Sequence, residues 1–254
     1  MPSAIALPPS IGAGIVRLGQ SCARRWQPGL VCEEGDAHHC EVLAPSGEAS
    51  GAGAALALAL DHLRTVRRGE HDETEDLRSV LWVQDQKSIR LNGRPYRPGL
   101  PPDLRERVIH VAADKAEDVL FALEEGLQCK DFACVIGELA GNPQALNFTT
   151  SRRLSLAAER HGVPLWLVRH DAARDLSSAR MRWQVRSERS PLPPWNAAAP
   201  GTPSWRAELF RSRTHTEGEW ILRDDTQRLS AQAARQAYPV GLAFAAGDRS
   251  LATG

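Results

Sequence analysis

The sequence predicts an α/β protein with a mostly parallel sheet flanked by helices, followed by a C-terminal antiparallel β-meander and a flexible tail. Three observations favour this class. A strand-like run at 40–43 leads through a glycine-rich turn into an Ala/Leu-rich helix at 54–67. Apolar strands and amphipathic helices then alternate up to residue 168, as in parallel sheets covered by helices. Beyond residue 181, polar and apolar residues alternate in short runs, which is typical of antiparallel strands.

Each further element follows from a local pattern. Short apolar runs that end in polar residues predict buried strands, and they lie at 79–83, 108–112, 132–139 and 163–168. Apolar residues three and four apart predict helices at 116–128, capped by Asp114, and at 151–161, capped by Thr149 or Thr150. Gly162 is expected to end the second helix.

The meander strands are expected at 181–186, 205–213 and 219–222, with an exposed Pro- and Ala-rich loop at 187–204. The weak periodicity beyond residue 225 predicts a partly disordered tail at 226–254. The chain is thus expected to consist of an N-terminal segment at 1–35, a core at 36–225 and this tail.

Composition is that of an ordinary globular protein, with 254 residues of which 42% are hydrophobic and 24% charged. No apolar run approaches the roughly 20 residues of a membrane span, and residues 1–11 lack the pattern of a secretory signal. An odd set of five cysteines is expected for reduced thiols. We therefore expect a cytoplasmic protein without membrane contact.

Charge is distributed unevenly, although the formal net charge is zero. Residues 1–150 carry 15 Lys and Arg against 21 Asp and Glu, whereas residues 151–254 carry 16 against 10. The basic half either faces nucleic acid or an acidic protein surface, or is simply a solvated arginine-rich surface.

The turn at 44–53 has the order strand, glycine-rich turn and helix, in which backbone amides and a helix N-terminus can hold phosphates. A working phosphate-binding loop also needs a lysine for the β- and γ-phosphates and a hydroxyl for Mg²⁺. Ala52 or Ala54 stands where the lysine belongs, and the first lysine of the chain is Lys87. Gly47, Gly51, Ala52 and Gly53 therefore form a degenerate loop.

The order of elements through most of 35–225 resembles the RecA-type ATPase core. In that resemblance Gln86, or Asp85, stands where the family has its catalytic glutamate, and Gly137 or Glu138 where it has the aspartate that supports Mg²⁺. A neutral amide is a poor base, and the missing lysine removes a charge from the transferring phosphates. The resemblance thus implies a RecA-like core with a degenerate loop, no catalytic residue, no cofactor, no metal and no enzymatic activity.

The amino-acid sequences of four segments resemble one group within that superfamily. Residues 91–100 (LNGRPYRPGL), 134–139 (CVIGEL), 161–169 (HGVPLWLVR) and 205–209 (WRAEL) are similar to ImuA proteins of proteobacteria, which are RecA/SulA-like accessory factors of damage-induced mutagenesis. The resemblance implies a role in the SOS response and translesion DNA synthesis. It also implies an ImuB-like homologue of Y-family polymerases and a C-family error-prone polymerase as partners, and a link to RecA itself.

The loops at 140–149 and 170–179 match the stretches with which RecA binds single-stranded DNA. Their surroundings predict the following DNA or partner contacts: Asn142, Arg152, Arg153, Arg169, Arg174 and Arg180. With Phe148 as the one aromatic there, weak or indirect contact with DNA is expected, and a protein interface fits this surface better.

Trp195 and Trp205 flank an apolar and basic loop and are candidate partner anchors. The alternative is that both pack the meander against the sheet.

Two other functional interpretations stay open. The chain could be a nucleotide-binding ATPase with an altered loop, or a SulA-like inhibitor of cell division. A zinc site of Cys32, His38, His39 and Cys40 is a further alternative, although it lacks a Cys-x-x-Cys pair and strand alternation would point neighbouring side chains oppositely.

Overall fold

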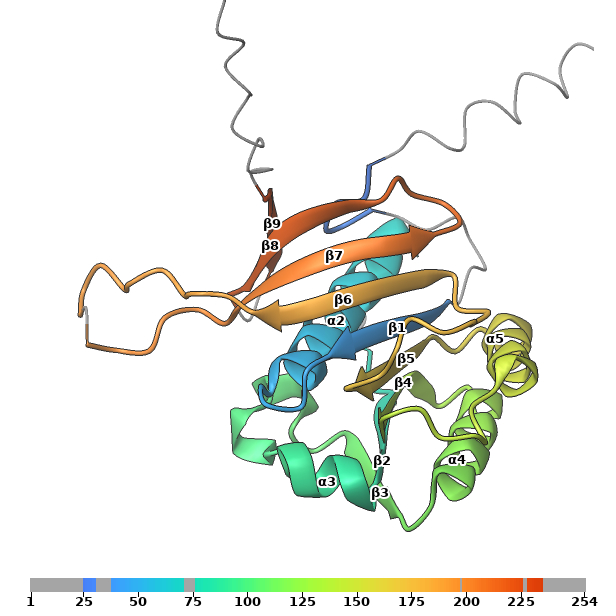
Figure 1. Ribbon diagram of the computed structural model, residues 1–254. Coiled ribbons are helices and arrows are strands. Elements are labelled where there is room, and N and C mark those ends of the chain that lie inside the picture. The colour runs from blue at the N-terminus through green and yellow to red at the C-terminus, as the bar shows by residue number, and fades with distance from the viewer. Residues whose placement is uncertain (1–24, 31–37, 71–75, 197, 226–227, 235–254) are drawn as a thin grey trace, which may run out of the picture.

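A computed structural model describes residues 25–30, 38–70, 76–196, 198–225 and 228–234 of the chain. These residues form a nine-stranded sheet with helices on both faces (Figure 1). The strands are β1 (His39–Ala44), β2 (Ser79–Asp85), β3 (Val108–Ala113), β4 (Phe132–Ala140), β5 (Leu165–His170), β6 (Met181–Ser187), β7 (Ser204–Ser212), β8 (Gly218–Asp224) and β9 (Leu229–Ala233). The helices are α2 (Ser50–Glu70), α3 (Gln86–Asn92), α4 (Ala116–Gln128) and α5 (Phe148–His161), with short 3₁₀ turns at Arg97–Gly99 and Pro102–Leu104.

The strands lie in the order β3-β2-β4-β5-β1-β6-β7-β8-β9. Neighbours from β3 to β6 run parallel, whereas β6 to β9 are joined as antiparallel neighbours. This confirms the predicted α/β class, with a mostly parallel sheet and an antiparallel C-terminal part.

Helices α2 and α3 cover one face of the sheet, and α4 and α5 cover the other (Figure 1). The strands supply alternate residues to the two layers, because successive side chains of a strand point to opposite faces. In β5, Trp166 and Val168 join the core beneath α2, while Leu165 and Leu167 join the core beneath α4 and α5.

The antiparallel part extends the core beneath α2. Trp183 and Trp220 lie on its inner face, and Trp26 packs edge-on against them at ring-centroid distances of 4.7 and 5.4 Å. Part of the segment predicted as N-terminal to the core is therefore built into the core. Edge-to-face packing of this kind stabilises aromatic clusters beyond their burial alone.

Helix boundaries and caps differ from the expectations in four places. Helix α4 has Lys115 rather than Asp114 at its N-cap, without a capping side chain. Helix α2 begins at Ser50 rather than at Ala54, so the last glycines of the predicted turn are helical. The residues directly after β2 form helix α3, with Asp85 as its N-cap accepting the Ser88 N–H at 2.7 Å. Helix α5 is capped by Asn147 rather than by a threonine, while Gly162 ends it with a φ of 73°, as predicted.

The sheet also extends past the predicted start of the tail. Strand β9 pairs with β8, and Leu229 is buried, so residues 229–233 belong to the sheet. The rest of the predicted tail, from 235 onward, lies outside the described residues, as do residues 1–24. Among the helices that are described, none has the length and apolar character needed to cross a bilayer.

Candidate functional site

The loop between β1 and α2 is the position at which a RecA-type protein would hold a nucleotide. One backbone N–H of the loop is bound by an acidic side chain from elsewhere in the chain, and one carboxylate of the loop binds a distant backbone N–H. The Ser46 N–H donates to the Asp171 carboxylate at 2.9 Å, and the Glu48 carboxylate accepts the Ser187 N–H at 2.5 Å. These hydrogen bonds lower the pKa of both carboxyls, so both are ionised at neutral pH.

No lysine or arginine occurs between Arg25 and Arg64, so the loop has no positive charge of its own. Phosphate-binding loops need free N–H groups and a cation. Here the Ser46 N–H is engaged and two carboxylates are present, which would repel a triphosphate. The loop therefore lacks the cation, and one of the free N–H groups, that a phosphate-binding loop uses.

The glycines of the loop serve helix packing. A Cβ at Gly51 would lie 2.8 Å from both the Ala44 Cβ and the Val168 Cγ1, and one at Gly53 would lie 3.1 Å from the Trp205 ring. Small residues at the start of α2 thus let the helix lie close against the sheet. Ala52 lies between them in the same helix, whereas Gly47 has open space around it.

A buried polar cluster lies where the parallel strands end, and we call it the Glu138 cluster. One Glu138 oxygen accepts the Trp82 indole N–H at 2.6 Å and the Gln84 amide at 3.0 Å, and the other lies 2.9 Å from the His170 Nε2. The Asn92 amide nitrogen lies 3.1 Å from both ring nitrogens of His170, so the contact with the Glu138 oxygen is the one that favours a proton on Nε2.

The Glu138 cluster satisfies its own carboxylate. Glu138 is 1% exposed and its three donors are neutral side chains or an imidazole of this chain. A general base must reach a proton of its substrate, and a metal ligand must have a free lone pair directed at the ion. In this structure all the hydrogen bonds given for the Glu138 carboxylate are made with side chains of this chain.

Gln86 does not contact Glu138, although the resemblance implies that both stand at former catalytic positions. Gln86 is the first residue of α3 and half-buried, and Gln84, two residues earlier on β2, makes the contact instead. Sequence reasoning missed Gln84, His170 and Asn92. The signal was a polar residue near the end of each of three apolar strands, at Gln84, Glu138 and His170.

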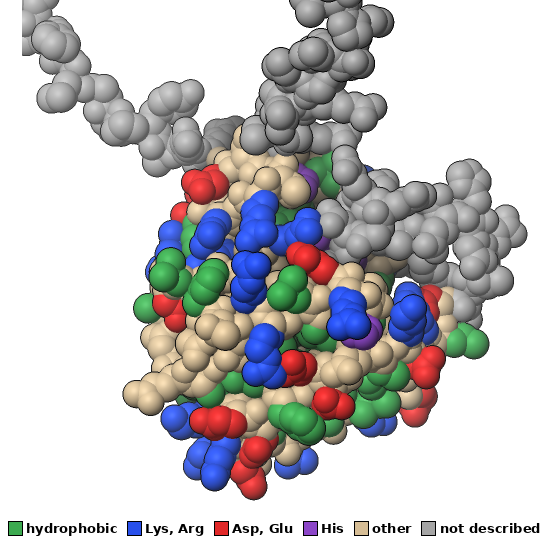
Figure 2. Space-filling view, turned by 90° about the vertical axis from the view of Figure 1, so that its right-hand side faces the viewer, with side chains coloured by type: hydrophobic (Ala, Val, Ile, Leu, Met, Phe, Trp, Pro, Cys, Tyr) green, Lys and Arg blue, Asp and Glu red, His purple; other side chains and the backbone are tan. Residues whose placement is uncertain are grey.

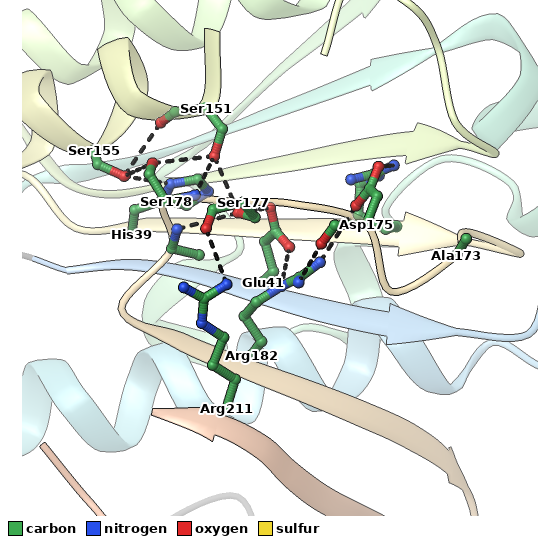
Figure 3. A network of polar contacts seen from close by, with 12 residues as sticks. His39, Glu41, Ser151, Ser155, Ala173, Asp175, Ser177, Ser178, Arg182 and Arg211 are labelled. Carbon is green, nitrogen blue, oxygen red and sulfur yellow. Dashed lines mark hydrogen bonds and ion pairs between the residues drawn. The ribbon is translucent and has the colours of Figure 1, made fainter. Parts of the chain in front are cut away.

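A second buried cluster lies on the opposite face of the sheet, beneath α5, and we call it the Glu41 cluster (Figure 3). Glu41 accepts the Arg182 Nε–H at 2.7 Å and the Ser177 hydroxyl at 2.6 Å, and Arg182 also donates to the Asp175 carbonyl at 2.6 Å. The cluster therefore fixes the loop at 171–180 to strands β1 and β6.

Serine hydroxyls complete this cluster. Ser155 lies 2.9 Å from the His39 Nδ1 and 2.6 Å from the Ser178 hydroxyl, and Ser151 bonds both Ser177 and Ser178. Although the set contains serine, histidine and glutamate, all are buried and engaged with one another (Figure 3). A nucleophile must face a substrate, so this cluster is structural.

Charge in the Glu41 cluster is settled by its neighbours. Burial alone would raise the pKa of Glu41, but His39, Arg182 and the Ser177 hydroxyl together hold it below its usual value. Burial also lowers the pKa of His39 to about 4. Because His39 is then neutral at pH 7, Arg182 is the charge that keeps Glu41 ionised at neutral pH.

Most of the predicted contact arginines are engaged within the chain. Arg169 is 1% exposed and bonds Asn142 at 2.9 Å, so it is not a surface contact. Arg153, Arg174 and Arg180 pair with Glu124, Glu208 and Glu159. Arg152 is exposed and forms no ion pair in the part of the chain that is described.

Figure 2 shows basic side chains gathered in the upper part of the face that carries α4 and α5, while its lower part carries acidic and basic side chains together. The roles of Arg152, Arg153, Arg174 and Arg180 as contacts stay predictions.

The two candidate tryptophans lie in different environments. Trp205 is 7% exposed and packs on the first turn of α2, so the alternative of core packing is correct for this residue. Trp195 is 77% exposed in the loop between β6 and β7. Only Trp195 therefore remains available to a partner.

The zinc alternative finds little support in the fold. His39 bonds Ser155, whereas Cys40 points to the opposite face, into the core beneath α2. Cys32 lies outside the described residues. His38 lines a hollow with Cys40 and His62, but no three His, Cys, Asp or Glu side chains gather to hold a metal within the described ranges.

Comparison with known proteins finds a distant similarity over part of the chain. No known protein-family profile matches the chain. A stretch of 160 residues is 29% identical to Protein ImuA of Caulobacter vibrioides, both in strain NA1000 / CB15N and in strain ATCC 19089 / CIP 103742 / CB 15. The alignment covers 57% of this chain and 59% of the length of these curated relatives. The chain is thus distantly similar to ImuA.

Proposed function

We propose that this chain is a non-catalytic accessory factor of damage-induced mutagenesis, built on a RecA-like core and acting through protein contacts. Its similarity to ImuA supports the biological setting. The observation that carries the non-catalytic part is the loop between β1 and α2, where Asp171 occupies the Ser46 N–H and no lysine or arginine lies in the loop.

The RecA-like assignment is also part of this proposal. The support is the strand order β3-β2-β4-β5-β1 in the parallel part, together with a glycine-containing loop that connects β1 to the helix α2. In such sheets ligands bind outside the carboxyl ends of the strands. In this chain that edge holds the Glu138 cluster.

The partners that we propose are an ImuB-like homologue of Y-family polymerases and a C-family error-prone polymerase, with RecA as a third candidate. The engaged arginines around the loop at 171–180 favour protein contacts over autonomous binding of single-stranded DNA, because a phosphate contact would have to replace an existing ion pair. We propose a cytoplasmic location on the same grounds as the function.

An ATP experiment tests the non-catalytic part. Purified chain is titrated with millimolar MgATP, with and without single-stranded DNA, while its melting temperature and phosphate release are followed. We expect neither stabilisation of the fold nor turnover of ATP. A nucleotide bound at about 100 times its Kd would stabilise the fold by roughly 2.7 kcal/mol, so an unchanged melting temperature would argue against binding of that strength. Turnover by the wild-type chain would establish the alternative, an ATPase with an altered loop.

A genetic experiment tests the setting. Deletion of the gene should reduce the frequency of mutations after ultraviolet damage, and a plasmid copy should restore it. Filamentation of undamaged cells on overexpression, with unchanged mutation frequency, would instead support a SulA-like inhibitor of cell division.

A further inference from the structure

The loop at 187–204 projects from the body of the molecule between β6 and β7 (Figure 1, orange loop on the left). It carries two large apolar side chains in water, Trp195 at 77% and Leu192 at 73% exposure. The other six tryptophans are at most 8% exposed: Trp26, Trp82, Trp166, Trp183, Trp205 and Trp220. The single exposed tryptophan is therefore an exception to a consistent pattern of burial, and its exposure needs an explanation.

The base of this loop is held by the sheet. The Glu188 N–H donates to the Ser204 carbonyl at 3.0 Å, and Glu188 also pairs with Arg206 at 2.9 Å. The Ser187 N–H is bound by Glu48. These contacts keep the two ends of the loop together and set the direction in which it leaves the sheet.

The loop also has internal contacts. A Cβ at Gly201 would lie 2.3 Å from the Pro191 carbonyl oxygen, so the segment that leaves the sheet and the segment that returns to it are in contact there. Near the tip, the Asn196 side chain accepts the Ala198 N–H at 3.0 Å. A preorganised loop loses less conformational entropy on binding than a free one.

Charge distinguishes the loop from its surroundings. No charged residue occurs from Ser190 to Ser204, whereas Arg186 and Arg189 are exposed at its base. Neither of these two arginine side chains forms an ion pair within the described part of the chain. The loop thus presents an apolar tip above a basic base.

We propose that this loop is a docking arm that inserts Trp195 and Leu192 into an apolar groove of a partner protein whose rim carries carboxylates facing Arg186 and Arg189. Tryptophan and arginine are the residue types enriched in interface hot spots. The arm fits a protein groove better than a nucleic acid, because binding of single strands combines stacking with a basic path along the backbone. Here the tip has no cation.

The first test rests on the proposed function, since its probe is the purified ImuB-like protein of the same cell. Calorimetric titration compares the wild-type chain with Trp195→Ala, Trp195→Phe and Leu77→Ala. Leu77 is 72% exposed, lies just before β2 and is the matched control. We expect Trp195→Ala to weaken binding by about 30-fold or more, Trp195→Phe to weaken it less, and Leu77→Ala to leave it unchanged. Equal affinity of Trp195→Ala and wild type would overturn the arm.

The second test does not depend on that partner. A photo-crosslinking amino acid at position 192 is activated in damaged cells, and the crosslinked residue is identified by mass spectrometry. A crosslink inside an apolar groove with Asp or Glu at its rim, abolished by Trp195→Ala, supports the arm whichever protein carries the groove. A crosslink to DNA, to a second copy of this chain, or to nothing overturns it. If the ImuB-like protein fails to bind but this crosslink forms, the named partner is wrong and the arm stands.

The two arginines at the base of the arm, Arg186 and Arg189, can be tested separately. Reversing the charge in Arg186→Glu together with Arg189→Glu should lower the association rate and its dependence on salt, while the dissociation rate changes little. All variants are checked for an unchanged melting temperature, since these side chains lie outside the core. An association rate unaffected by the reversal would overturn the carboxylate rim.

Discussion

The Glu138 and Glu41 clusters bury a carboxylate on opposite faces of one sheet, and they satisfy it in different ways. Glu138 is surrounded by the donors of Trp82, Gln84 and His170, whereas Glu41 faces the guanidinium of Arg182. The first cluster closes the carboxyl edge of the strands, and the second holds a loop in place. A buried carboxylate in a parallel sheet can thus be entirely structural, and what differs is the charge left behind when one partner is removed.

The strongest test of this difference removes the cation. Arg182→Met should destabilise the fold by about 3–5 kcal/mol, because Glu41 would remain buried without a counter-charge. Urea unfolding measures the loss. The matched control replaces both partners, as Glu41→Leu with Arg182→Met, and should recover most of the stability. A single-variant loss below about 1 kcal/mol would show that Glu41 does not need the pair.

A second effect comes from pH. Burial holds the pKa of His39 and of His62 at about 4, against an ordinary 6.5 in the unfolded chain. Between these values the unfolded state binds more protons, so stability falls as pH drops from 6.5 to 4. Each histidine should contribute roughly 1.4 kcal/mol per pH unit within that window.

Urea midpoints from pH 4.5 to 7 measure this slope. His39→Gln and His62→Gln should each reduce it by about half, because the other histidine still contributes. The lowered pKa of Glu41 adds a further loss only below this range, as that carboxylate protonates. A slope that His39→Gln leaves intact would mean that its ring is protonated in the folded protein.

A smaller effect is expected at the other cluster. Glu138→Leu removes the acceptor of three buried donors without leaving a buried guanidinium unpaired, so the loss should be about 1–3 kcal/mol. Chemical unfolding beside Arg182→Met gives the comparison directly. If the Glu138 variant is the less stable of the two, then the Glu138 cluster carries more of the fold than the ion pair does.

The smallest effect belongs to the surface. Arg174 pairs with Glu208 and lies 4.2 Å from the centroid of the Phe210 ring, and it is nearly half exposed. Arg174→Ala should therefore cost less than about 1 kcal/mol. A larger loss would mean that Arg174 contributes as much to stability as the buried polar side chains do.

Local patterns predict the strands well, because runs such as 79–83 and 132–139 are apolar over the length of one strand. They fail at α2, where the glycines predict a turn but Gly51 and Gly53 are helical. The role of these glycines depends on Ala44, Val168 and Trp205, which are distant in the chain and close only after folding. Strand β9 is not predicted because its burial depends on pairing with β8 rather than on its own hydrophobicity.

Only the residue types of the candidate site could be predicted from the sequence, and not the contacts that they make. The missing lysine is visible in the sequence, but the capture of the Ser46 N–H by Asp171 joins residues far apart in the chain. The same holds for Arg169 and Trp205, whose side chains the sequence could not distinguish from exposed ones. Pairing and burial are properties of the folded chain, so composition alone cannot predict them.

Helix α2 contacts β5 and β1 in the parallel part of the sheet and β6 and β9 in the antiparallel part. One helix therefore spans both halves, and both halves lose apolar contacts if it detaches. Heating should accordingly produce a single calorimetric transition, and hydrogen exchange of the amides in β5 and β8 should proceed through the same opening event.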